Sequence, residues 1–143
     1  MRLVPLALVV LAAIAGCDTV TSRYDNLAQA RADDLFERGW LPDVLPPSSR
    51  DIRVSNDLNL NISEGGFRFA PTEFALLQIR LNPLSDAAPP FTRAFDDRIK
   101  SHLQAGEPAY QYEDEASTWI FLCNRGRGEC TYVMWVRRSA GGQ

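Results

Sequence analysis

The chain has 143 residues, which is enough for one domain and too few for two domains of ordinary size. Hydrophobic residues make up 45% of it and charged residues 23%, a composition that excludes wholesale disorder. The formal net charge of −3 disfavours nucleic acid as a partner, because nucleic-acid-binding proteins present a basic face, and it provides no general attraction to anionic lipid.

Residues 1–16 have the pattern of an export signal. A positive start at Met1-Arg2 leads into a nearly unbroken apolar run, Leu3–Ile14, which is too short to span a bilayer. The run ends in Ile14-Ala15-Gly16-Cys17, which resembles the lipobox of bacterial lipoproteins. The resemblance implies that the signal peptide is removed and that Cys17 carries acyl chains such as palmitate, which anchor the protein to a membrane. An ordinary secreted protein with a chance cysteine at this place is the alternative.

The resemblance to a lipobox predicts where the protein is located and how its chain is divided. Asp18 resembles the inner-membrane retention signal of enteric bacteria, so we expect a lipid-anchored protein of the bacterial cell envelope that faces the periplasm, with the inner membrane favoured. The predicted segments are the signal peptide (1–16), a lipidated tether (17–22), one globular domain (23–138) and a flexible tail (139–143).

Two cysteines remain after Cys17 is assigned to the lipid. The oxidising periplasm makes a disulfide between Cys123 and Cys130 the expected state. Structural zinc needs four thiol or imidazole ligands, and His102 is the one further candidate. We therefore predict a disulfide bond, no metal and no other cofactor.

The first half of the domain reads as one helix, a packed arm and several strands. Tyr24–Arg38 has a loose helical stripe, with Asp25 as a candidate cap and Gly39 as a stop. Trp40–Ser49 contains three prolines between apolar residues, which indicates an extended arm packed on the domain.

Strands are expected after the arm. Asp51–Val54 is a short strand, and Asp57–Ser63 alternates apolar and polar residues as a half-buried strand does. Gly65-Gly66 then predicts a turn into Phe67–Phe69.

The next stretch contains two predicted helices. Pro71–Leu81 has a proline in its first turn, and Asn82–Pro90 is a loop. Thr92–Gln104 has Thr92 as its cap and Gly106 as its stop.

A strand at Ala109–Tyr112 and a hairpin of Thr118–Cys123 with Cys130–Arg137 complete the domain. Opposed Cα atoms in an antiparallel pair are close enough for a disulfide. If the two cysteines face each other, three further pairs follow: Trp119–Met134, Ile120–Val133 and Phe121–Tyr132. Both faces of this hairpin are apolar, so we expect helices on one face, with the other either covered by the arm or left as a partner surface.

One stretch resembles a group of small bacterial envelope lipoproteins of no known activity. The resemblance lies in Phe36–Pro42, which contains Arg-Gly-Trp-Leu-Pro, followed by Leu45-Pro46 and Ser48–Ile52, and by a C-terminal aromatic hairpin. It implies a single α+β domain, an antiparallel sheet with about three helices and a disulfide-closed C-terminal hairpin. It transfers no functional residues.

Candidate sites are few. Arg125 and Arg127, in a glycine-containing loop, are the best candidates for anion or partner contact, against the alternative of a solvated loop tip. Asp57-x-Asn59-x-Asn61 opens like a calcium loop, but positions six and twelve, Ile62 and Arg68, do not fit one. His102 is the one possible catalytic base, and no nucleophile motif accompanies it.

We therefore expect a membrane-anchored lipoprotein that is not an enzyme and acts as a protein-interaction module with an envelope protein partner. An inhibitor or immunity-type lipoprotein, acting against a lytic enzyme or phage product, is the second hypothesis. A hydrolase using His102 is the third.

Overall fold

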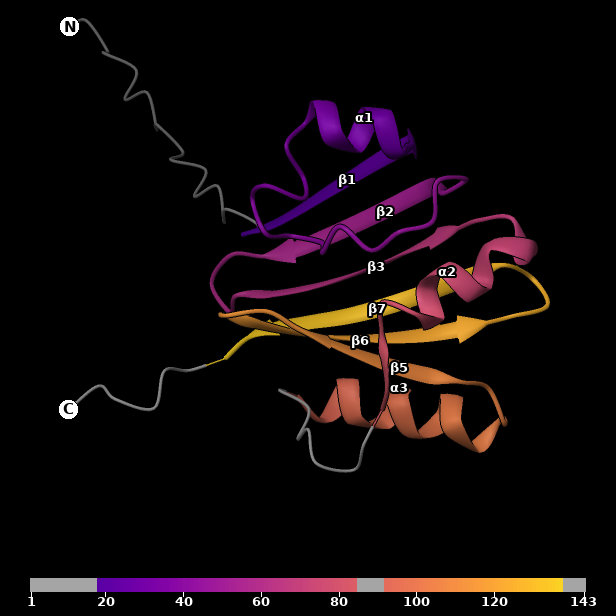
Figure 1. The fold of residues 1–143 in the computed structure, drawn as a ribbon. Helices are drawn as coiled ribbons and strands as arrows, with labels where there is room; N and C mark the ends of the chain where they lie inside the picture. Colours follow the sequence, from indigo (N-terminus) through magenta and orange to yellow (C-terminus); the bar gives the residue numbers. More distant parts are fainter. Residues whose placement is uncertain (1–17, 85–91, 138–143) are drawn as a thin grey trace, which may run out of the picture.

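A seven-stranded antiparallel sheet organises the part of the chain that the computed structural model describes, residues 18–84 and 92–137 (Figure 1). The strand order is β1-β2-β3-β7-β6-β5-β4. The strands are β1 (Thr19–Asn26), β2 (Arg50–Asp57), β3 (Ile62–Arg68), β4 (Asn82–Pro83), β5 (Ala109–Glu113), β6 (Ser117–Asn124) and β7 (Glu129–Val136). The helices are α1 (Leu27–Ala32), a 3₁₀ turn at Pro71–Glu73, α2 (Phe74–Gln78) and α3 (Arg93–Gln104). The predicted fold class, one α+β domain with about three helices, is confirmed.

The C-terminal hairpin has the predicted register. Cys123 pairs with Cys130 and is joined to it by a disulfide. The three predicted neighbouring pairs are also opposite each other: Trp119–Met134, Ile120–Val133 and Phe121–Tyr132. Ser117–Cys123 of β6 and Tyr132–Trp135 of β7 are buried, because a core packs on each face of the hairpin.

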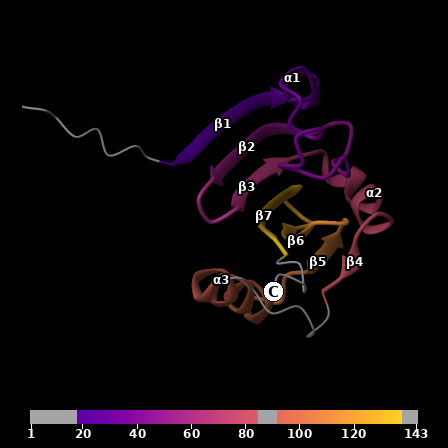
Figure 2. The same cartoon turned by 90° about the vertical axis from the view of Figure 1, so that its left-hand side faces the viewer.

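Each face of the central strands packs on its own set of elements. Alternate residues of β6, beginning at Trp119, face a large core shared with the arm, α1 and α2. The residues between them, Ile120 and Leu122, face a smaller core with Phe95 and Ile99 of α3. Figure 2 shows the curved sheet with α3 on one side and with the arm and α2 on the other. The predicted packing of the proline-rich arm is confirmed, since Leu41 is fully buried.

The predicted tether and first helix are corrected. Thr19–Ser22, expected to be a free tether, belong to β1 and pair with β2 as far as Thr19 opposite Asp57. Strand β1 continues to Asn26, so the helix begins at Leu27 and the cap is Asn26, not Asp25; the Asn26 side chain accepts a hydrogen bond from the backbone N of Gln29. The free hydrogen-bonding edge of β2 supplies partners that override the local helical pattern. Residues 1–16, Cys17 and the tail 139–143 lie outside the described residues.

The predicted single strand over Asp57–Ser63 is wrong: Leu58–Asn61 form the turn between β2, which ends at Asp57, and β3, which begins at Ile62. The Asp57 carboxylate accepts hydrogen bonds from the backbone N of Asn59 and of Leu60, which closes the chain on itself. Asn61 then takes a φ of 53° that suits a turn. Gly65-Gly66, predicted to be that turn, lies inside β3. A glycine is needed at position 65 because the Arg53 backbone of β2 comes too close for any Cβ.

The remaining helices follow the sequence more closely. Pro71–Leu81 forms the 3₁₀ turn and the short helix α2, and α3 has its predicted cap, since Thr92 Oγ1 accepts from the backbone N of Phe95. Gly106 has the positive φ expected after a helix. The predicted loop Asn82–Pro90 begins instead as β4, which pairs with β5, and residues 85–91 lie outside the described part.

Candidate functional site

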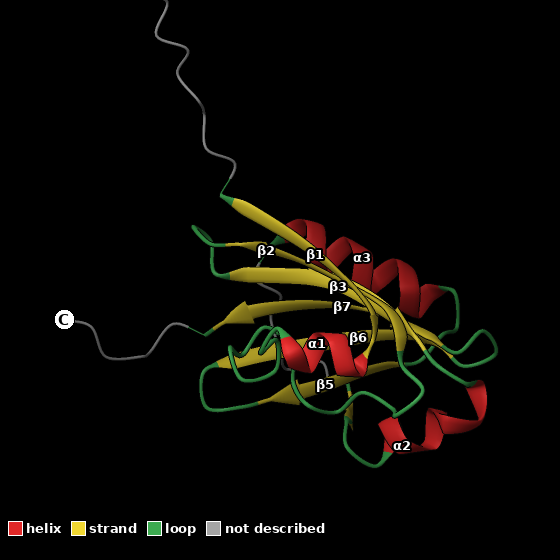
Figure 3. Ribbon diagram, turned by 90° about the horizontal axis from the view of Figure 1, so that it is seen from above, coloured by secondary structure: helices red, strands yellow, loops and turns green. Residues whose placement is uncertain are grey.

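The arm, residues 40–49, forms the floor of a groove of about 400 Å³ between α1 and α2. We call it the arm groove. Its lining residues are Leu27 and Arg31 of α1, Asp43–Pro47 of the arm, Leu76 of α2, and Ile79 and Arg80 just after α2. The view from above in Figure 3 shows α1 and α2 apart from each other, with loop segments between them.

The floor of the groove owes its shape to proline. Pro42, Pro46 and Pro47 fix the backbone φ and remove hydrogen-bond donors, so the arm cannot join the sheet as a central strand. It lies over the sheet and is held by Val44 and Leu45, whose side chains belong to the large core. Val44–Pro47 also line the groove, and of these Pro47 is exposed, so the floor is apolar.

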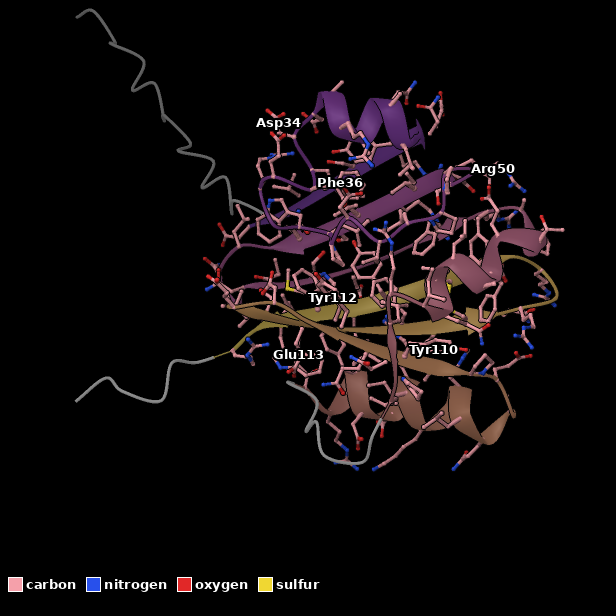
Figure 4. The ribbon with its side chains drawn as sticks, viewed as in Figure 1. Asp34, Phe36, Arg50, Tyr110, Tyr112 and Glu113 are labelled. Atoms are coloured by element: carbon pink, nitrogen blue, oxygen red, sulfur yellow. A yellow bond between two sulfur atoms is a disulfide. The ribbon has the colours of Figure 1, made fainter. Side chains whose placement is uncertain are left out.

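Helix α2 forms a wall with apolar side chains on both sides. Phe74 and Leu77 are buried, and Phe74 packs edge-on against Tyr110 of β5 at 5.9 Å between ring centroids. Gln78 Nε2 donates to the Tyr110 hydroxyl at 3.2 Å, and Figure 4 labels this tyrosine beneath α2. These contacts fix the helix, and they leave Leu76 and Ile79 on the groove side, 40% and 79% exposed.

An ion pair joins the arm to α1 at the rim. Arg31 Nη1 and Nη2 donate to the two carboxylate oxygens of Asp43 at 3.1 and 2.9 Å. The hydrogen bonds from Arg31 lower the pKa of the Asp43 carboxyl, and the same bonds raise the pKa of the Arg31 guanidinium. Arg80 Nη1 donates to the backbone oxygen of Asp43 at 2.8 Å, so both walls are linked to one arm residue. With two guanidiniums and one carboxylate, this rim carries one net positive charge.

Arg31 also shapes the outer end of the α1 wall. Its guanidinium lies over the ring of Phe36 at 5.0 Å from the centroid. A second hollow, of about 310 Å³, lies on this side; beyond Arg31 and Asp43 it is lined by Asp34, Phe36 and Glu37. Figure 4 labels Asp34 and Phe36. The arm groove is thus flanked beyond α1 by two acidic side chains and one aromatic side chain.

The predicted arginine loop divides into two separate arrangements. Arg125 lies over Phe74 of α2 at 4.9 Å from its centroid and donates to Gln78 Oε1 at 3.1 Å. Arg127 is bound through its backbone N to Asn124 Oδ1, and its guanidinium is 3.6 Å from the Glu129 carboxylate. Each guanidinium therefore has its own intramolecular partner, and anion or partner contact by this loop stays a prediction.

The other polar candidates make structural contacts. His102 Nε2 donates to the backbone oxygen of Pro108 at 2.9 Å, which ties the end of α3 to the start of β5. Asp33 accepts from Tyr24 and pairs with Arg38, and Asp96 pairs with Lys100. In residues 18–84 and 92–137, no three His, Cys, Asp or Glu side chains are grouped as a metal ion would require.

The exposed apolar side of α2 is a feature that the sequence analysis did not predict. The segment Phe74–Ile79 is apolar at almost every position, so a helix here has apolar residues on both its buried and its open side. That pattern indicates either a fully buried helix or a helix with an exposed apolar side. The structure shows the second, because Ile79 is 79% exposed.

Comparison with known proteins bears on the N-terminal part of the domain. Residues 18–68 match the family model of the YbbD head domain. The matched segment contains β1, α1, the arm, β2 and β3, and so includes one wall and the floor of the arm groove. No curated protein and no solved structure matches the chain. Among the described residues, no helix has the length and apolar character needed to cross a membrane.

Proposed function

We propose that this chain is a lipid-anchored protein of the bacterial envelope that binds an envelope protein partner in the arm groove and catalyses no reaction. The match to the YbbD head domain supports a bacterial envelope protein, and Ile14-Ala15-Gly16-Cys17 supports the anchor. The observation that carries the binding role is the apolar groove itself, in which Ile79 is 79% exposed beside Leu76. Apolar side chains that line a rigid hollow are typical of contact surfaces.

The chemistry of the groove selects the kind of partner. Its floor and the α2 wall accept an apolar side chain, and the rim adds one net positive charge through Arg80. Arg80 makes its hydrogen bond to a backbone carbonyl, so its charge is not neutralised by that contact. We therefore propose a partner segment that places an apolar side chain next to an acidic one.

The anchor is tested by the mass of the N-terminal peptide of the protein isolated from membranes. The expected peptide begins at Cys17 and carries the mass of its acyl chains. A Cys17→Ser variant should leave the membrane fraction, because it lacks the acyl chains that hold the protein there. An unmodified Cys17 in a protein that still sediments with membranes would contradict the anchor.

The groove is tested by a photo-crosslinking amino acid at position 79. The matched control is the same amino acid at position 103, because Leu103 is 47% exposed and lies outside the groove. The expected result is one product, formed at position 79 and not at 103, whose partner is identified and purified. Equal products at both positions would contradict a role of the groove.

Binding of the purified partner then tests the chemistry. Ile79→Asp should weaken binding at least about tenfold, because burial of an isoleucine side chain contributes about 1.5–3 kcal/mol. Arg80→Glu should also weaken it if the partner segment is acidic. Leu103→Asp is the control and should bind like the unaltered protein. Unchanged affinity of Ile79→Asp would remove the proposal.

A further inference from the structure

Exposed apolar side chains gather at the end of the sheet where the chain enters the domain. Four of the seven large hydrophobic side chains that are exposed in the described residues lie here: Val20, Leu58, Leu60 and Val136. We call these four residues the entry tip. Leu58 and Leu60 are 49% and 51% exposed, and both belong to the four-residue turn between β2 and β3. Turns normally carry polar residues and glycine, so two leucines in one turn need a reason.

Backbone hydrogen bonds hold the three segments of the entry tip together. The backbone N of Leu58 donates to the Asp18 carbonyl at 3.1 Å, and the Asn59 side-chain amide donates to the Asp18 carboxylate. The backbone N of Val136 donates to the Asn61 carbonyl at 3.1 Å. The start of β1, the turn and the end of β7 therefore form one fixed surface.

The position of Asp18 links this surface to the proposed anchor. Cys17 precedes Asp18 directly in the sequence, and Asp18 is already bonded to the turn. Within the tether expected over residues 17–22, Thr19–Ser22 are instead part of β1. A lipid on Cys17 would thus join the chain one residue before Asp18, about 3.8 Å between successive Cα atoms, and Asp18 is bonded to Leu58 of the entry tip.

We propose that the entry tip rests on the lipid bilayer, with Leu58 and Leu60 in the boundary between headgroups and acyl chains. This inference rests on the proposed lipid at Cys17. An anchor one residue away keeps the tip at the bilayer surface, so a contact that is weak on its own is occupied most of the time. Burial of half-exposed leucines in this boundary is favourable because it removes apolar surface from water.

The charges near the tip indicate the type of lipid contact. Asp18 and Asp57 flank the turn, and their carboxylates accept hydrogen bonds from Asn59 and from the backbone of the turn. Arg137, which follows Val136, is paired with Glu113 at 3.9 Å. The two carboxylates beside the leucines disfavour anionic headgroups, so the contact is apolar and is strongest on zwitterionic lipid.

The contact also orients the proposed binding groove. Figures 1 and 3 show α2 near the opposite end of the sheet from the start of β1. With the entry tip on the bilayer, the α2 wall with Leu76 and Ile79 points away from the membrane. Partner binding and membrane contact therefore use separate ends of the domain.

Tryptophan quenching by lipids with brominated acyl chains tests the contact. Leu60→Trp places the probe on the entry tip, and Leu103→Trp is the matched control, because Leu103 has nearly the same exposure and lies at the end of α3. Each variant is purified from membranes and reconstituted in phosphatidylcholine vesicles, and the signal of the unaltered protein is subtracted for its own tryptophans. If mass analysis finds no lipid on Cys17, its thiol is coupled to a maleimide-bearing lipid, so the entry tip is tested in either case.

The expected result is that the added fluorescence at position 60 falls by about half and that the control at position 103 is unaffected. Adding Leu58→Asp to Leu60→Trp should reduce the quenching at least about twofold, because it places a charge in the apolar boundary. Lipid containing phosphatidylglycerol should not increase the quenching. Equal quenching at positions 60 and 103, or none at position 60, would overturn the membrane contact while leaving the anchor on Cys17 to be judged by its mass.

Discussion

Gly65→Ala tests whether this glycine permits a close approach of two strands. An ideal Cβ at position 65 would lie 1.9 Å from the backbone oxygen of Arg53 and 2.8 Å from its carbonyl carbon. It would also lie 3.0 Å from the Tyr132 hydroxyl. The Arg53 atoms belong to the backbone of β2, which pairs with β3 at this point, so they cannot rotate away as a side chain would.

The magnitude follows from the shift that these contacts demand. Non-bonded heavy atoms attract best at about 3.5–4.0 Å, so β2 and β3 must separate by about 1.5 Å. Overpacking of this kind costs about 1–3 kcal/mol, and the loss of one or two ladder hydrogen bonds adds about 1–2 kcal/mol. Alanine recovers about 0.4–1 kcal/mol by restricting the unfolded chain. We expect Gly65→Ala to lower the free energy of unfolding by about 3 kcal/mol.

The assay is urea unfolding followed by circular dichroism and by the fluorescence of the buried tryptophans. Gly126→Ala is the matched control, because its added Cβ would meet one atom, Asn124 Oδ1, at an ordinary 3.7 Å. That variant should stay within about 0.5 kcal/mol of the unaltered protein. If Gly65→Ala also stays within about 1 kcal/mol, the close approach of β2 and β3 is wrong, and a turn at Gly65-Gly66 becomes the better description.

Three further predictions concern the disulfide, a helix cap and a buried tyrosine. Cys123→Ser with Cys130→Ser should lower the free energy of unfolding by about 2.5 kcal/mol, as the loop entropy of a short closure gives; an equal unfolding midpoint in the presence and absence of reducing agent would refute this. Thr92→Ala should cost about 1 kcal/mol and Thr92→Ser much less, because only the hydroxyl caps the helix, so similar losses for both by urea unfolding would exclude the capping role. Burial raises the pKa of the Tyr132 hydroxyl above its ordinary value of about 10, so the folded state keeps a proton that the unfolded state loses first. This contribution to stability is complete below about pH 9 and is lost progressively as the pH rises above about 10 towards the higher pKa of the folded state. The loss should be smaller in Tyr132→Phe, and identical pH profiles of the two unfolding midpoints would contradict the assignment.

The elements that the sequence predicted well are those with local signals at both ends. Helix α3 has a capping threonine before it and Gly106 after it, and each signal acts within a few residues. The hairpin of β6 and β7 has two cysteines that define the register, and every other pair follows by alternation.

The candidate site was harder to predict, because it depends on which side of a helix stays open. The sequence favoured Arg125 and Arg127 for their charge, whereas the structure places Arg125 against α2 and Arg127 beside Glu129. The exposure of Ile79 depends on how α2 packs over Tyr110 of β5, which comes 32 residues after Gln78 in the chain. No local sequence pattern predicts this packing between distant segments.

Strand β1 shows most clearly what the sequence determined and what only the tertiary structure decided. Hydrophobic patterning, caps and cysteines determined the α+β class, the C-terminal hairpin and the limits of α3, because these depend on interactions between near neighbours. Along β1, Tyr24 alone is buried, so this edge strand has no apolar alternation to reveal it. It exists because Arg50–Asp57 offers a free hydrogen-bonding edge. Thr19 pairs with Asp57, a residue far along the sequence that the fold brings beside it. That pairing replaces the expected tether and brings Asp18 onto the turn of Leu58 and Leu60.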